Sequence, residues 1–133
     1  MPAELISAAL RARENAVAPY SHFKVGAAIE AADGNVFTGC NIENASLGLT
    51  VCAERVALWK ALSEGERNFR RIAVVTDAAE AVTPCGACRQ LLWEYCGDIP
   101  VLVHSIRGGS QTFRLAELFP QPFDDHFSTG KSS

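Results

Sequence analysis

Two short cysteine motifs constrain this chain more than any other feature. The first is Cys52-Ala53-Glu54, and the second is Pro84-Cys85-Gly86-Ala87-Cys88. Three thiols, with a carboxylate that is not needed as a ligand, suit a zinc ion that keeps one coordination position open. A water molecule at such a position becomes a nucleophile. The first hypothesis is therefore a hydrolytic zinc enzyme.

The second motif is expected to open a helix. Thr83-Pro84 offers an N-cap followed by proline at the first helical position, which predicts a helix from there to about Cys96. Cys85 and Cys88 then share one face of the first turn, near free backbone N–H groups and the positive end of the helix dipole. Both effects favour the thiolate, which is the form that binds a metal.

Cys52 holds the equivalent position in a helix predicted from Thr50 to about Leu62. Two helix N-termini directed at one point would bring the three thiolates to one ion. Such a centre carries a net charge of about −1 before water binds. Arg55 and Arg89 each follow a motif residue directly and are candidates to donate hydrogen bonds to the sulfurs.

Glu54 is the candidate proton carrier. It lies two residues beyond Cys52, so that both side chains can reach past the helix end toward a metal. A carboxylate beside a metal-bound water can take its proton and pass it to a substrate. The alternative is a solvated glutamate favoured by the helix dipole. Because Glu54 falls in an otherwise apolar helix, the catalytic interpretation is preferred.

The cysteines could also serve in a structural zinc site, in a redox pair or as plain core residues. A structural site with four cysteine ligands would need Cys40 or Cys96 as well. Cys96 lies too far from Cys85, since a helix rises ~1.5 Å per residue; Cys40 is harder to dismiss. A thioredoxin-like redox pair leaves Cys52 and Glu54 unexplained. We interpret Cys40 and Cys96 as plain buried cysteines.

Composition narrows the class of partner. The chain has 133 residues, a formal net charge of −3 and a pI of about 5.6, which fits one domain over residues 1–133. No basic footprint is present, so a small, uncharged substrate is favoured over nucleic acid. There is no apolar run that could span a bilayer and no signal sequence, so no membrane partner and a cytoplasmic location are expected. The five cysteines are then expected to be reduced.

The periodicity predicts a layered α/β domain with a mixed sheet, because helices alternate with strands and the first two strands form a hairpin at Asp33-Gly34. The tail after about residue 123 is polar and expected to be flexible. The predicted helices are Pro2 to about Ala18, Thr50 to about Leu62, Pro84 to about Cys96 and Leu115 to Phe119, and the predicted strands are Phe23 to Ala31, Asn35 to Ile42, Ile72 to Thr76, Pro100 to Ile106 and Gln111 to Arg114.

Together these motifs carry a resemblance. Cys-x-Glu followed by Pro-Cys-x-x-Cys is the signature of zinc-dependent deaminases. The chain resembles the small homotetrameric cytidine deaminases, which act on free nucleosides, over nearly its whole length. The matching segments are Tyr20 to Ala28, Gly39 to Ala45, Cys52 to Arg55 and Pro84 to Gln90.

The resemblance implies a three-layer α/β/α fold with a mixed five-stranded sheet and one zinc ion per chain. It implies hydrolytic deamination of cytidine and 2′-deoxycytidine to uridine and 2′-deoxyuridine plus ammonia by zinc-bound hydroxide, a step of pyrimidine salvage. The zinc ligands would be Cys52, Cys85 and Cys88, and the acid and base would be Glu54. Cysteine rather than histidine at position 52 separates the chain from polynucleotide-editing and deoxycytidylate deaminases.

The same resemblance implies a substrate site. Asn41 and Glu43 would bind the ribose hydroxyls, and a carboxylate there argues against a phosphorylated substrate. Phe23 would stack near the base and Ala53 would contact the substrate. Phe123 would be lent to the active site of a neighbouring subunit.

One departure from the family pattern falls in a loop expected to reach a neighbouring subunit's site. This loop contains Ala45 and Leu47. Position 47 is commonly tyrosine in the family, so the leucine here removes the ring and hydroxyl of that contact and leaves the chemistry unchanged. Two alternatives stay open: a deaminase of a modified cytosine nucleoside of the blasticidin type, and a non-catalytic structural zinc module.

Overall fold

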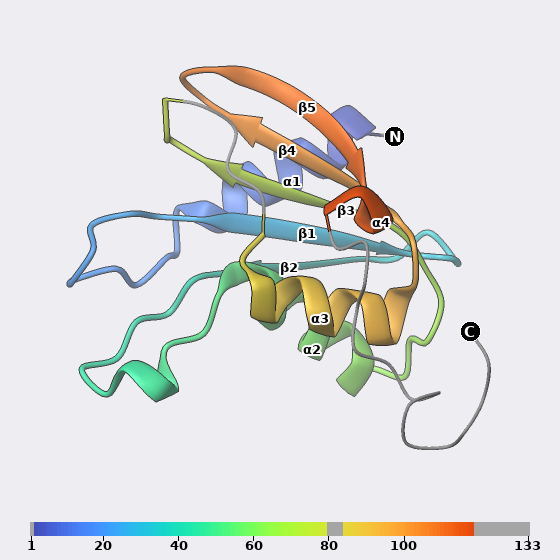
Figure 1. Cartoon of the computed structure of the whole chain (residues 1–133), viewed down its shortest axis with the longest axis horizontal. Coiled ribbons are helices and arrows are strands. Elements are labelled where there is room, and N and C mark those ends of the chain that lie inside the picture. The colour runs from blue at the N-terminus through green and yellow to red at the C-terminus, as the bar shows by residue number, and fades with distance from the viewer. Residues whose placement is uncertain (1, 80–83, 119–133) are drawn as a thin grey trace.

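A mixed five-stranded sheet forms the centre of the molecule (Figure 1). The computed structural model describes residues 2–79 and 84–118. The strand order is β2-β1-β3-β4-β5, with β3 and β4 parallel and the other neighbours antiparallel. The mixed sheet and the antiparallel pairing of the first two strands confirm the prediction from sequence. The strands are β1 (Gly26–Ala31), β2 (Val36–Cys40), β3 (Phe69–Thr76), β4 (Pro100–Ser105) and β5 (Gly109–Arg114).

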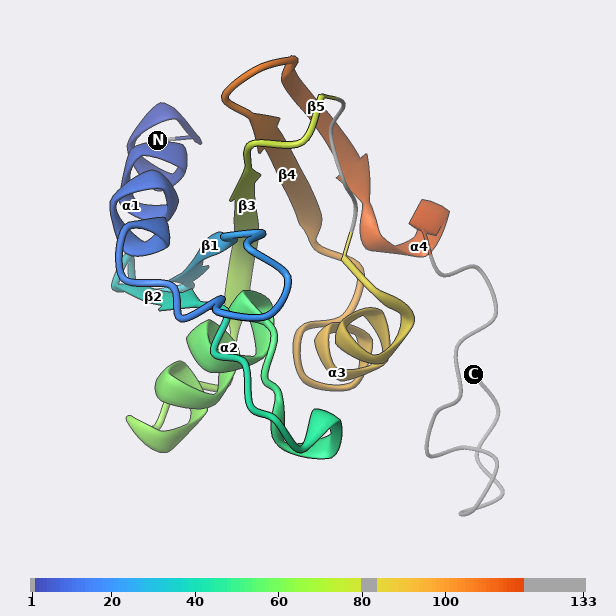
Figure 2. The same cartoon turned by 90° about the vertical axis from the view of Figure 1, so that its left-hand side faces the viewer.

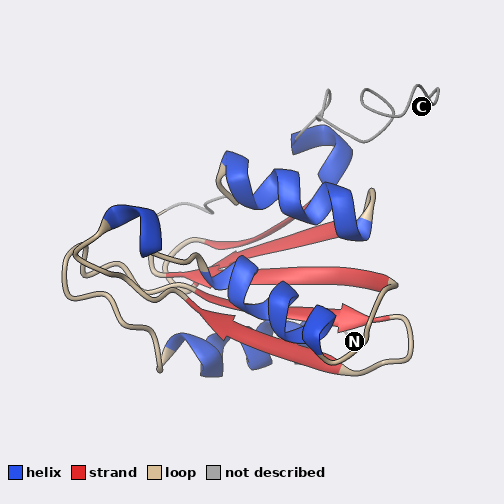
Figure 3. Cartoon of the chain, turned by 90° about the horizontal axis from the view of Figure 1, so that it is seen from below, coloured by secondary structure: helices blue, strands red, loops and turns tan. Residues whose placement is uncertain are grey.

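Helices cover both faces of this sheet, which confirms the three-layer prediction (Figure 2). Helix α1 (Pro2–Arg13) packs on one face, and α2 (Ala53–Ser63) and α3 (Gly86–Cys96) pack on the other. Figure 3 views the sheet from the side of α2 and α3. A short helix, α4 (Leu115–Leu118), follows β5 directly.

Alternation along β1 divides the core between the two faces, because successive side chains of a strand point to opposite sides. Ala28 packs in a cluster with Leu5 and Ala9 of α1. Ala27 and Ile29 pack in the larger cluster on the side of α2 and α3. Among residues 2–79 and 84–118, no helix is long and apolar enough to cross a membrane.

Several predicted boundaries were wrong, and tertiary pairing explains the first of them. The first helix ends at Arg13, not near Ala18. The chain turns there, and Val17 then forms a parallel bridge with Ile42. A local helical pattern cannot anticipate this pairing, which joins two segments far apart in the sequence.

The boundaries around the cysteines also shift. The second helix begins at Ala53 rather than Thr50, with Cys52 as its N-cap, and the third begins at Gly86, with Cys85 as its N-cap. Pro84 therefore precedes the helix instead of opening it. The predicted N-cap Thr83 and the end of the last predicted helix, Phe119, lie outside the described residues.

Gly39 allows the sheet to approach α2 closely, just where that helix begins. A Cβ atom on Gly39 would lie 2.5 Å from the carbonyl oxygen of Ala53 and 2.6 Å from the backbone nitrogen of Ala57. Both contacts are with backbone atoms, so a side-chain rotation cannot relieve them. Overpacking of this kind costs about 1–3 kcal/mol.

We therefore expect Gly39→Ala to lower the free energy of unfolding by about 1–3 kcal/mol, measured as a shift of the urea midpoint at fixed zinc concentration. Gly48→Ala is the matched control, because a Cβ atom there meets nothing within 4 Å. Equal midpoints for the two variants would show that α2 moves away from β2 without cost.

Candidate metal centre and adjoining pocket

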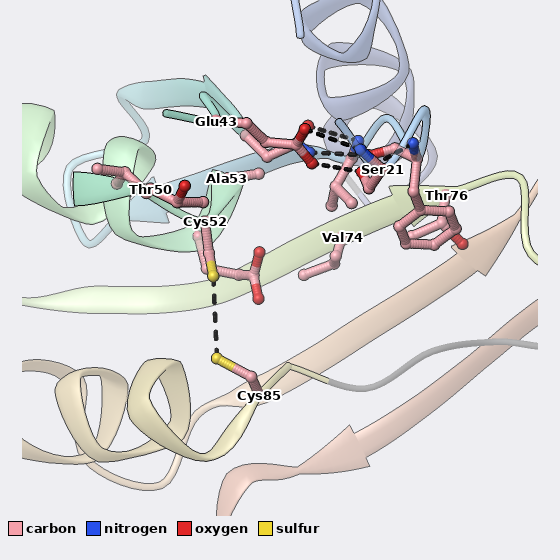
Figure 4. A pocket seen from close by; sticks show the side chains of 13 residues that line it. Ser21, Glu43, Thr50, Cys52, Ala53, Val74, Thr76 and Cys85 are labelled. Carbon is pink, nitrogen blue, oxygen red and sulfur yellow. Dashed lines mark hydrogen bonds between the residues drawn. The ribbon is translucent and has the colours of Figure 1, made fainter. Parts of the chain in front are cut away.

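The N-terminal ends of α2 and α3 converge and bring three thiols together. Cys52 is the N-cap of α2, Cys85 is the N-cap of α3, and Cys88 lies in the first turn of α3. Their Sγ atoms all lie within 4.8 Å of one another. The Cys52 and Cys85 sulfurs are 3.9 Å apart (Figure 4) and those of Cys85 and Cys88 are 3.3 Å apart. This is the convergence that the two predicted helix starts implied.

This group fits one zinc ion. Three soft sulfur donors supply three of the four tetrahedral positions that zinc prefers and leave one open. Within the described part of the chain, no other set of three or more His, Cys, Asp or Glu side chains has such a geometry. Neither Cys40 nor Cys96 belongs to the group, which is evidence against a structural site with four cysteine ligands.

Arg55 approaches the three thiols from the third position of α2. Its Nη2 atom donates a hydrogen bond to Cys52 Sγ at 3.4 Å. Arg89 instead donates to the carbonyl oxygens of Pro84 at 2.7 Å and Leu118 at 2.8 Å. Arg55 is thus in contact with a sulfur, while the hydrogen bond of Arg89 to Leu118 joins α3 to α4.

The thiols differ in acidity before a metal binds. A hydrogen bond from Cys88 lowers the pKa of Cys52 to about 5, and the hydrogen bond and charge of Arg55 act in the same direction against the effect of burial. The bond to Cys52, together with burial, holds the pKa of Cys88 far above its usual range. Without a metal, Cys52 therefore favours the thiolate and Cys88 keeps its proton. Because zinc binds thiolates, loading the site must release protons.

Glu54 lies beside the thiols but outside the ligand group. It is only 5 % exposed and sits in the first turn of α2. Burial, with a contribution from the charge of Cys52, raises the pKa of Glu54 to about 7. A carboxyl group whose pKa lies near neutrality can both accept and donate a proton at physiological pH.

A pocket of about 330 Å³ opens next to this group (Figure 4). Its volume falls in the range that is typical of small-molecule sites. The pocket joins the metal group to the residues predicted to bind substrate, since Phe23, Asn41, Glu43, Ala53 and Glu54 all line it together with Cys52 and Cys85. Val25, Val51 and Val74 add apolar surface, and Ser21, Thr50 and Thr76 add hydroxyl groups.

Asn41 holds the segment that carries Phe23. Its Oδ1 accepts the N–H of Val25 at 2.9 Å, and its Nδ2 donates to the carbonyl oxygen of Phe23 at 2.8 Å. These two bonds keep residues 23–25 out of β1, so the strand that was predicted to start at Phe23 starts at Gly26 instead. The amide of Asn41 thus holds in place Phe23 and Val25, two of the residues that line the pocket.

Glu43 is anchored by the turn before Phe23. Its Oε1 accepts the backbone N–H groups of Tyr20 at 3.0 Å and Ser21 at 3.1 Å. The Ser21 hydroxyl donates to Oε2 (Figure 4). The side-chain bond from Ser21, followed by its backbone bond, lowers the pKa of Glu43. Sequence reasoning did not select Ser21, although it lies in one of the segments that carry the resemblance.

Comparison with known proteins agrees with this geometry. The family model for the cytidine and deoxycytidylate deaminase zinc-binding region matches residues 2–103. The cytidine deaminase of Halalkalibacterium halodurans is 52 % identical over 120 residues, which cover 90 % of this chain and 91 % of that protein. This chain belongs to the cytidine and deoxycytidylate deaminase family.

This chain is also similar to a solved cytidine deaminase structure and, at lower identity, to a blasticidin-S deaminase. The crystal structure of cytidine deaminase from Burkholderia pseudomallei superposes with a TM-score of 0.88 at 47 % identity, covering 92 % of this chain and 99 % of that one. The blasticidin-S deaminase of Bacillus cereus is 34 % identical over 104 residues, covering 72 % of this chain and 74 % of that protein.

Two predicted site residues of this deaminase-family chain do not line its own pocket. Ala45 and Leu47 belong to the loop between β2 and α2, and Leu47 opens a short 3₁₀ helix, Leu47–Leu49. Leu47 is 84 % exposed. Phe123 lies outside the described residues.

Proposed function

We propose that this chain hydrolyses cytidine and 2′-deoxycytidine to uridine and 2′-deoxyuridine, with release of ammonia, as a step of pyrimidine salvage. The observation that carries the proposal is the composition of one pocket. It joins a three-thiol metal group, a buried carboxyl group and polar residues suited to a sugar. The relatives at 47 % and 52 % identity, both cytidine deaminases, support the same activity.

The chemistry is divided among a few residues. Cys52, Cys85 and Cys88 would hold zinc, which when bound would supply a water molecule of lowered pKa as the nucleophile. Glu54 accepts a proton from the attacking water and donates it to ring N3 of the cytosine. Glu54 then passes the second proton of that water to the amino group, which leaves as ammonia. The contact of Arg55 with Cys52 withdraws negative charge from the sulfurs.

The rest of the pocket binds the nucleoside. Phe23 flanks the base, Ala53 contributes the buried wall beside it, and Asn41 with Glu43 receives the sugar. A carboxylate attracts a sugar hydroxyl, which can donate a hydrogen bond, and repels a phosphate. A nucleoside rather than a nucleotide is therefore the expected substrate.

Assembly as a homotetramer in the cytoplasm belongs to the same proposal. Large apolar side chains are exposed on the segments before β1 and between β2 and α2, which the bridge between Val17 and Ile42 joins. Exposed apolar surface on adjoining segments is typical of an interaction site. These side chains are Val17, Tyr20, Ile42, Leu47 and Leu49. Ala45, Leu47 and Phe123 would complete the pocket of a neighbouring subunit. The thiol ligands require a reducing environment, as in the cytosol.

Turnover of cytidine and zinc content, measured on one preparation, test the proposal. We expect loss of cytidine absorbance, stoichiometric ammonia and about one zinc per chain. Blasticidin S is the comparison substrate, because a blasticidin-S deaminase is among the relatives. If kcat/KM were higher for blasticidin S than for cytidine, the protein would be a deaminase of the modified nucleoside and cytidine would not be its main substrate. A zinc-loaded protein that is inert toward every cytosine nucleoside would indicate a structural zinc module.

A further inference from the structure

The hydroxyl of Ser21 lies between two residues that the proposed function places at the substrate. It donates a hydrogen bond to Oε2 of Glu43 and accepts one from the backbone N–H of Phe23 at 3.0 Å. Both Ser21 and Glu43 line the pocket (Figure 4). A single side chain therefore connects the sugar-binding carboxylate to the segment that carries the base-flanking ring.

The hydrogen bonds of Glu43 limit what it can offer a ligand. A carboxylate has about four acceptor positions on its two oxygens. Tyr20 and Ser21 backbone N–H groups occupy those of Oε1, and the Ser21 hydroxyl occupies one on Oε2. One position on Oε2 is left for a sugar hydroxyl, and the bond from Ser21 fixes the direction in which that position points.

The backbone around Ser21 needs such a restraint. His22 has a φ of 57°, in the left-handed backbone region that residues other than glycine rarely adopt. The Ser21 hydroxyl spans this residue by bonding the N–H of Phe23, a local turn in which a serine side chain replaces a backbone acceptor. On its other side, Phe23 is held through its carbonyl oxygen by Asn41.

We propose that Ser21 is a positioning residue for the sugar subsite: its hydroxyl orients Glu43 toward one ring hydroxyl of the nucleoside and ties that carboxylate to the Phe23 segment. Ser21 acts through Glu43 and makes no contact with the reacting atoms. This inference rests on the proposed function, in which Glu43 receives the sugar.

The test is Ser21→Ala, assayed with cytidine and with 2′,3′-dideoxycytidine, which lacks both ring hydroxyls. Removing the serine hydroxyl frees Oε2 to turn toward water. We expect the KM for cytidine to rise about tenfold, the worth of one hydrogen bond to a charged group, with kcat changed by less than about threefold. The KM for 2′,3′-dideoxycytidine should stay within about twofold, since that substrate offers Glu43 no ring hydroxyl.

A binding measurement separates positioning from damage to the fold or to the zinc centre. The dissociation constant of uridine, measured by calorimetry, should also rise about tenfold in Ser21→Ala. Ser21→Thr keeps a hydroxyl and should restore both constants. Ser63→Ala is the matched control, because the Ser63 hydroxyl bonds only the Lys60 carbonyl oxygen within the described residues, at the far end of α2.

The Glu43→Ala variant separates a failure of the role proposed for Ser21 from a failure of the sugar-binding role proposed for Glu43. If Glu43→Ala abolishes the preference for cytidine over 2′,3′-dideoxycytidine and Ser21→Ala leaves it intact, the role of Ser21 is wrong and the sugar role of Glu43 stands. If Glu43→Ala also leaves the preference intact, the sugar role itself is wrong. Under the proposal, Ser21→Ala causes no further loss of the preference for cytidine over 2′,3′-dideoxycytidine in the Glu43→Ala background, because that preference depends on the one interaction that both changes remove.

Discussion

Replacing Glu54 with glutamine is expected to lower kcat for cytidine on the order of a thousandfold while the protein keeps its zinc. Glutamine has nearly the same shape, but its amide cannot carry the proton from water to N3. Because Glu54 lies outside the group of three thiols, its loss should leave the metal in place. Single-turnover rates, with zinc measured on the same sample, check this expectation.

Glu64→Gln is the matched control for this variant. Glu64 caps the opposite, C-terminal end of α2 and is exposed, so the same chemical change there should not alter turnover. If the Glu54 variant turned over cytidine at the wild-type rate, the assignment of the proton carrier would be wrong. If it lost zinc as well as activity, Glu54 would have to be treated as part of the metal site.

Replacing Cys85 with alanine is expected to remove zinc and with it all measurable turnover. Cys85 is the most informative of the three thiols because its side chain is exposed and makes no capping hydrogen bond, whereas Cys88 is fully buried. Its substitution therefore removes a metal ligand without opening a cavity or losing a cap. Two remaining thiols do not make a stable structural or catalytic zinc site.

Loss of the metal should also lower the melting temperature. Zinc joins the N-termini of α2 and α3, and a ligand present at a thousand times its dissociation constant stabilises the folded state by about 4 kcal/mol. For a domain of this size we expect a fall on the order of 10 °C, both in Cys85→Ala and in wild-type protein treated with a chelator.

Cys40→Ala is the control for the metal experiment, since Cys40 lies on β2 outside the thiol group. It should retain one zinc per chain and full activity. A Cys85 variant that still bound one zinc with wild-type affinity would show that the metal centre has been misidentified.

Local patterns in the sequence were sufficient for much of the fold. The Asp33-Gly34 turn between β1 and β2 is a property of neighbouring residues and was predicted correctly. All five strands were expected as well, although β3 begins at Phe69 rather than Ile72. The two cysteine motifs also carry their own helix starts, so the approach of Cys52 to Cys85 could be expected before any coordinates were known.

The features that were missed depend on contacts between distant segments. The end of α1 is decided by the pairing of Val17 with Ile42, and the start of β1 by the side chain of Asn41. The role of Ser21 depends on Glu43, which lies more than twenty positions away in the chain. No periodicity or capping rule contains this information, because each outcome is a competition between local preference and a long-range hydrogen bond.

Arg55 has a consequence for the charge of the whole reaction centre. Arg55 is held against Cys52 by a direct hydrogen bond. Its positive charge, added to that of a divalent zinc ion, balances the negative charges of the three thiolates. The centre then carries only the charge of the ionised Glu54, and this total is unchanged when Glu54 takes a proton from the attacking water. A neutral nucleoside can then enter, exchange a neutral amine for a neutral oxygen function and leave, without a net charge being transferred into the buried interior at any stage.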